Sequence, residues 1–286
     1  MKRNDILTIG GVALGVAGAF LLGKNIAAQD AKDAIEEKKD QLLKENPDLD
    51  EPQALVEAAA DVAEEALEAV RTAEEEAKVP EKTTTATESE KTLEDAEKDA
   101  LLDPTDETLQ KALAEAEAKT AADWADLITA KKVAYETALF ELEKALAAAK
   151  IAVAAYDKAY EDVVKYQDQL QQARDKLRRL ITIRTEVWDA ENWALGDAYT
   201  VKINELVNLI NGAYTIELQK ALNKLTPLIF NASVAISKTD NAVDLVEVYA
   251  REALNFELLL AMATRLTTVA SSTRTKLAEL EEHLAS

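Results

Sequence analysis

The sequence is poor in residues that break helices and in residues that build most active sites. It has no cysteine, one histidine, seven glycines and five prolines, and aromatic residues make up 5% of it. Without cysteine there is no disulfide framework, thiolate metal site or cysteine nucleophile. The single histidine, His283, excludes zinc sites built on two histidines and the paired Glu-x-x-His motifs of di-iron bundles.

Motifs that depend on glycine are also missing. The sequence contains no complete Gly-x-x-x-x-Gly-Lys-Ser/Thr phosphate loop, no Gly-x-Gly-x-x-Gly and no Gly-x-Ser-x-Gly. Acidic pairs such as Asp48/Asp50 and Asp106/Glu107 fall in loops or on polar helix faces, where nothing would desolvate them. We therefore expect a non-enzymatic protein with no catalytic residue, no cofactor, no metal and no small-molecule substrate.

Positive charge is scarce relative to negative charge. The chain has 54 acidic and 33 basic residues, a net charge of −21. Such a surface repels phosphates, so we expect no nucleic-acid partner. It favours solubility, and it could attract a basic partner.

What the sequence has in abundance is alanine, glutamate, leucine and lysine, the composition of long helices. After Pro104 neither proline nor glycine occurs until Gly196, and Asp103-Pro104 is a helix-start pattern. Residues 103–195 therefore predict one helix of roughly 140 Å. We expect Gly196 to form the corner that leads into a second helix, 197–226, with a phase shift near Gly212 and an end at Pro227.

Apolar residues in the long helix recur at alternating steps of three and four, which is typical of a coiled-coil seam. The seam residues are Leu139, Leu142, Leu146, Val153, Tyr156 and Tyr160. A last predicted helix, 240–286, has the same spacing, carried by Phe256, Leu259, Leu266, Leu277, Leu280 and Leu284. A heptad pattern of this length indicates a helical partner in the same chain or in another.

A basic cluster interrupts the later part of the long helix. It consists of Arg174, Lys176, Arg178 and Arg179, with Arg184 close by. Pairing with the acidic first third of the chain is the favoured interpretation, and a site for phosphate or lipid headgroups is the alternative.

Residues 29–102 read as an acidic helical stalk. Residues 46–50 break it, and Asp50 has the position of an N-cap for the next helix. That helix has an alanine-rich seam and ends near Lys78. Residues 80–90 are rich in threonine and predict a linker.

The N-terminal stretch 6–23 carries no charge, and about 18 residues is the lower limit for a membrane-spanning helix. Gly11, Gly15 and Ala19 form a stripe of small residues on which two such helices could pack. Lys2 and Arg3 favour a cytoplasmic N-terminus and an extracytoplasmic body. Two other interpretations remain: a signal peptide cleaved after residues 17–19, and a buried helix inside a protein assembly.

A short glycine-rich span followed by a charged, alanine-rich helical body resembles the layout of membrane-anchored stress proteins of the YtxH type. It is also similar to that of small anchored structural proteins of membrane-containing virions. The likeness lies in composition and in the first forty residues, and it transfers no functional residue.

Together these patterns predict an all-α protein: an N-terminal transmembrane helix followed by a long antiparallel coiled coil or elongated helical bundle. The predicted divisions are an anchor (1–28), the stalk (29–102) and the bundle (103–286). We expect a structural scaffold, with a virion or surface-appendage component as its most concrete form, that forms homo-oligomers or a larger assembly and contacts a membrane through residues 6–23. The alternatives are an extracytoplasmic adaptor or adhesin for a basic partner, and a secreted helical protein.

Overall fold

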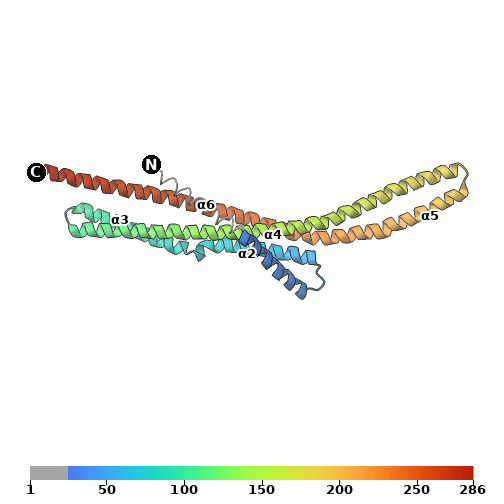
Figure 1. The fold of residues 1–286 in the computed structure, drawn as a ribbon, viewed down its shortest axis with the longest axis horizontal. Coiled ribbons are helices and arrows are strands. Elements are labelled where there is room, and N and C mark those ends of the chain that lie inside the picture. Colours follow the sequence, from blue (N-terminus) through green and yellow to red (C-terminus); the bar gives the residue numbers. More distant parts are fainter. Residues whose placement is uncertain (1–24, 286) are drawn as a thin grey trace. The chain divides into compact units, whose positions relative to one another are not determined.

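The structure, a computed structural model, describes residues 25–285, with side chains up to residue 253 (Figure 1). Every regular element in that range is helical, which confirms the predicted all-α class. After a helical segment at 25–45, the elements are α2 (Glu51–Glu76), α3 (Val79–Leu102), α4 (Glu107–Asp189), α5 (Trp193–Leu209), a π-helical turn η1 (Ile210–Tyr214) and α6 (Thr215–Ala285).

The chain divides into two compact units that share three helices. Unit 1 is Met1–Glu64 with Lys144–Thr239, and unit 2 is Glu65–Glu143 with Asp240–Ser286. Helices α2, α4 and α6 each contribute to both units. The sequence-based boundary at 102/103 falls inside unit 2.

The core of unit 1 is built largely from alanine. Ala148 and Ala152 of α4 pack with Ala232 and Ala235 of α6, and all four are buried. Other buried members of this cluster are Ile35, Val56, Ala59, Val62 and Leu228. Alanine at the contact points lets helices approach closely, so the core is thin but tightly closed.

Helices α2 and α6 run parallel in unit 1. Lys238 pairs with Glu64 across 174 residues at 2.8 Å, and Lys224 pairs with Asp50 at the same sequence separation at 3.4 Å. The two pairs lie fourteen residues apart on each helix, which is two heptads, so the two helices keep one register over this distance.

Beyond this core, unit 1 continues as a two-helix arm made of α4 from about residue 163 onward, α5, η1 and the start of α6 (Figure 1). Val163 packs against Ala221 and Leu225. Leu170 packs against Leu206 and Ile210. Because partners move backward along the chain as α4 moves forward, the two sides of the arm are antiparallel.

Unit 2 pairs α3 with α4 in the same antiparallel sense. The Thr120 hydroxyl donates to the Ser89 carbonyl at 3.0 Å, and Lys82 pairs with Asp126 at 2.8 Å. Both Ser89 and Thr120 are buried. This hydrogen bond satisfies a hydroxyl between two close helices.

The start of the long helix differs from the prediction. Asp103 accepts hydrogen bonds from the Thr105 amide and hydroxyl and so closes a turn. Asp106 is the N-cap, accepting from the Thr108 amide at 2.7 Å and from the Leu109 amide at 3.4 Å. The prediction that the helix starts at Asp103-Pro104 is therefore wrong by one turn. Asp106 caps the helix instead, because its carboxylate accepts the Thr108 amide at 2.7 Å, whereas Asp103 accepts the Thr105 amide at 3.2 Å.

The corner at the other end of α4 is also misplaced by the sequence. The chain turns at residues 190–192, where Glu191 has a left-handed backbone (φ 61°) and Asn192 caps α5 through the Leu195 amide at 3.3 Å. Gly196 lies inside the first turn of α5 and is buried. Gly196 does not turn the chain; it leaves space for the Trp188 side chain.

Two predicted interruptions are helical. Residues 80–90 lie inside α3, where threonine hydroxyls donate to carbonyls four residues back and Ala86 is buried. Pro227 lies inside α6. Buried Leu225 and Leu228 flank that proline, so burial on both sides offsets its lost hydrogen bond. The phase shift predicted near Gly212 is confirmed by the π-helical turn η1.

Candidate assembly surfaces

The predicted seam residues of α4 lie at different depths. Leu142 is buried, and Leu139, Leu146, Val153 and Tyr156 are half-buried. Tyr160 is 46% exposed and stacks on Tyr156, with ring centroids 6.0 Å apart. The fully buried positions are mostly the alanines beside them: Ala134, Ala138, Ala145, Ala148 and Ala152. A seam predicted from leucine and tyrosine alone does not include these alanines. The alanines are nevertheless spaced by four, seven, three and four residues, which is the same helical periodicity.

The predicted seam of the last helix lies beyond the described side chains. The backbone of α6 is helical through the positions of Phe256, Leu259, Leu266, Leu277, Leu280 and Leu284. A continuous helix there agrees with the expectation, and the seam itself stays a prediction.

The basic cluster is exposed along α4 in the arm. Arg178 pairs only with Asp175, three residues away at 3.4 Å, and Arg184 stacks on the Trp188 ring at 4.9 Å. Within residues 25–253 the structure records no ion pair for Arg174, Lys176 or Arg179. The expected pairing with the acidic first third is not found among the described residues. From residue 174 to 184 the sequence has five basic residues and one acidic residue, and exposed Ile181 and Ile183 lie among them.

The end of α3 and the turn that leads into α4 carry the opposite charge. From residue 90 to 107 eight acidic residues face two basic ones. Leu101 and Leu102 are 79% and 83% exposed, which is unusual for two adjacent leucines. The Asp106 carboxylate accepts the Thr108 amide hydrogen bond, which lowers its pKa below the usual value. We call residues 90–107, the end of α3 and the turn into α4, the acidic tip; it combines this charge with the exposed leucine pair.

A third surface is apolar and lies on the first half of α6. Leu222, Ile229 and Ile236 recur every seven residues and are exposed. Phe230, beside them, is 68% exposed. Three large side chains at heptad spacing next to the core form a stripe that a helical partner could cover.

The corner between α4 and α5 is held by an aromatic contact. A methyl group added at Gly196 would lie 1.7 Å from the Trp188 ring nitrogen, so the indole rests directly on the glycine backbone. The indole N–H is buried and has no hydrogen-bond partner in the described part of the chain. Trp193, by contrast, is 63% exposed.

In unit 2, polar contacts join α6 to α2 and α4. Lys131, whose side chain is 11% exposed, pairs with Glu74 of α2 at 3.6 Å and with Glu252 of α6. The Tyr249 hydroxyl donates to the Val70 carbonyl at 3.1 Å. Burial, with smaller contributions from Glu74 and Glu252, raises the pKa of Tyr249. These contacts fix the register of α6 against α2 and α4.

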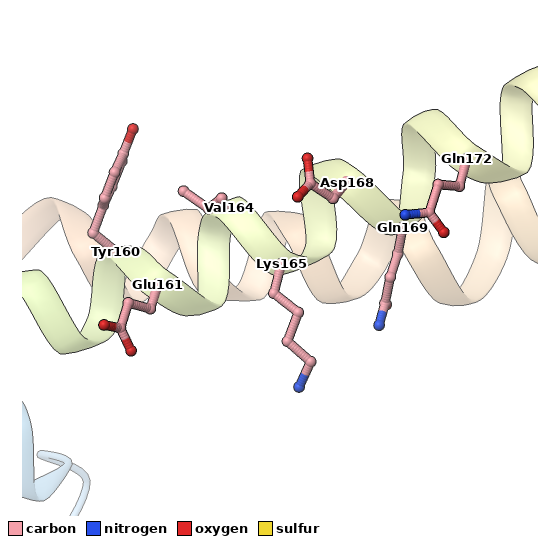
Figure 2. A pocket seen from close by; sticks show the side chains of 7 residues that line it. All are labelled: Tyr160, Glu161, Val164, Lys165, Asp168, Gln169 and Gln172. Atoms are coloured by element: carbon pink, nitrogen blue, oxygen red, sulfur yellow. The ribbon is translucent and has the colours of Figure 1, made fainter.

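A shallow depression on α4 lacks the chemistry of an active site. Seven side chains of one helix line it, among them Tyr160, Val164, Lys165 and Asp168. Figure 2 shows Tyr160 and Lys165 pointing away from the helix in different directions, without converging on a common point. No second element closes this depression, so it offers a small molecule no enclosed contact.

In the part of the chain that the structure describes, no group of three or more acidic, histidine or cysteine side chains is placed to hold a metal ion. Likewise, no helix there is long and apolar enough to cross a bilayer. The predicted span 6–23, with Gly11, Gly15 and Ala19, lies outside the described residues.

The arrangement is thus three contrasting surfaces on a framework of long helices: a basic cluster, an acidic tip and an apolar stripe. Comparison of the chain with protein-family models, with curated proteins and with solved structures gives no match.

Proposed function

We propose that this protein is a non-enzymatic structural scaffold that assembles with further copies of itself through its long helices. The exposed apolar stripe of α6 carries the proposal. Phe230 at 68% exposure and Ile229 at 47% present large apolar surface to water. Covering one such side chain contributes about 1.5–3 kcal/mol, enough to drive association of helices.

The long, alanine-lined helices support the mechanical side of this role. Helix α4 has 83 residues and extends by about 1.5 Å per residue. Packing against neighbouring helices keeps such a helix extended. The proposal includes antiparallel coiled-coil contacts through the α4 and α6 seams. It also includes membrane attachment through residues 6–23, with a cytoplasmic N-terminus and an extracytoplasmic body, or attachment to the membrane of a virion.

The test is sedimentation velocity of the full-length chain in mild detergent at high salt, which screens ionic contacts. We expect the sedimentation coefficient to rise with protein concentration. Phe230→Glu should weaken this association by about tenfold or more, because the new carboxylate would have to be buried. Asn204→Glu is the matched control, since Asn204 is exposed on α5, outside the stripe, and the change adds the same negative charge.

A protein that stays monomeric at every concentration would rule out the scaffold. The competing function is an adaptor that recruits a basic partner, which the net charge of −21 favours. In that case a basic partner would co-purify at low salt and be released at high salt, with no effect of Phe230→Glu.

A further inference from the structure

We infer that copies of this chain also join through two different surfaces, the acidic tip of one copy docking on the basic cluster of the next. This inference rests on the proposed self-association and names a second, ionic contact for it. The two surfaces differ in charge, so the contact is heterologous. A heterologous contact that does not close into a ring produces an open chain of molecules.

The acidic tip has the properties of a docking element. Eight acidic and two basic residues between 90 and 107 leave it strongly negative. Among the side chains that the structure describes, one ion pair is found there, between Lys98 and Asp95 at 3.3 Å. Leu101 and Leu102 project from the same turn at about 80% exposure. Charge would steer the encounter, and the leucine pair would supply apolar area to bury.

The basic cluster offers the complementary surface. Arg174, Lys176 and Arg179 are exposed and have no ion pair within residues 25–253, and Arg178 is held only by its neighbour Asp175. Ile181 and Ile183, 40% and 37% exposed, lie among these cations as the leucines lie among the carboxylates. Each surface therefore presents one sign of charge around an apolar pair.

A second copy is the occupant favoured by these observations. On a chain with a net charge of −21 this cluster is a concentrated positive stretch, and the nearest abundant source of matching negative charge is the same chain. Charge complementarity between the two surfaces therefore favours a second copy as the occupant.

The experiment combines charge reversal with isotope-labelled cross-linking of the full-length protein at low salt. Arg178→Glu/Arg179→Glu should weaken assembly about tenfold, and Glu97→Lys/Asp99→Lys should do the same. Mixing the two variants should restore assembly, because each then supplies the surface that the other needs. Lys150→Glu/Lys158→Glu is the matched control: both lysines are exposed on α4 outside the cluster, and the change in net charge is the same.

A carbodiimide that joins amines to carboxylates should link Lys176 to carboxylates of the acidic tip. In a mixture of ¹⁴N and ¹⁵N protein, these cross-links should carry both labels. Cross-links within one label only, or assembly unaffected by either reversal, would overturn the inference. So would loss of binding to phosphatidylserine vesicles in Arg178→Glu/Arg179→Glu with assembly unchanged, which would identify a lipid-headgroup site.

Failure of this inference and failure of the scaffold are distinguishable. Association that persists at high salt and depends on Phe230 supports the scaffold even when both charge reversals have no effect. Monomers at all salt concentrations reject both.

Discussion

At the scale of single residues, Gly196 lies in direct contact with the Trp188 side chain. The indole occupies the space of a missing side chain, and the helix continues through Gly196 with an ordinary backbone. The glycine is therefore needed for the space it leaves and not for conformational freedom. The arm depends on this contact because it has only two helices and small clusters such as Leu170, Ala173, Leu206 and Ile210.

We expect Gly196→Ala to destabilise the arm by about 1–3 kcal/mol, because the ring must move to admit a methyl group. Thermal unfolding followed by tryptophan fluorescence would measure the change. Gly212→Ala is the control, since a methyl group there meets nothing within 4 Å. Equal melting temperatures for the two variants would show that the indole shifts without cost.

At the scale of helices, the sequence predicted the existence of the helices better than their ends. The Asp50 cap is confirmed, with the Gln53 amide donating to its carboxylate at 3.0 Å. Local propensity predicts a corner at Gly196, a linker at 80–90 and a helix end at Pro227. Burial of Ala86, Leu225 and Leu228 outweighs that propensity, and burial is a tertiary property.

The candidate surfaces were predicted in part. The basic cluster is visible in the sequence because five cations occur within eleven residues. The acidic tip cannot be distinguished in the sequence, because acidic residues are common throughout the first third of the chain. Its distinguishing feature is the exposure of Leu101 and Leu102, and only the fold reveals that.

The start of α4 gives a prediction at this scale. Asp106→Ala should speed amide exchange at Thr108 and Leu109, since their amides lose an acceptor, whereas Asp103→Ala should not. The pKa of Asp106 is lowered in the folded state, so its contribution is present above the unfolded pKa and is lost as pH falls through the folded value. The difference between wild type and Asp106→Ala should therefore shrink below about pH 4. A difference that does not depend on pH would contradict an ionised cap.

At the scale of the whole chain, repulsion among like charges opposes folding. The surplus of acidic residues gives a net charge of −21. Most ion pairs among the described residues join exposed side chains, and such pairs contribute little to stability. Added salt screens the repulsion.

We therefore expect the melting temperature to rise by several degrees between low and high sodium chloride, measured by circular dichroism at 222 nm. Potassium chloride should have the same effect, because screening does not depend on the identity of the cation. A falling melting temperature would mean that the surface ion pairs outweigh the net repulsion.

The antiparallel arm also restricts how the length of this protein can change during evolution. Val163 of α4 packs against Ala221 and Leu225, and Leu170 packs against Leu206 and Ile210, so the two antiparallel helices of the arm are in one register. A seven-residue deletion in α4 alone would displace every later contact by about 10 Å. A deletion of the same length on both sides would shorten the arm and leave each remaining contact in place. Insertions and deletions in relatives of this chain should therefore occur in compensating pairs of whole heptads, equidistant from the corner at 190–192.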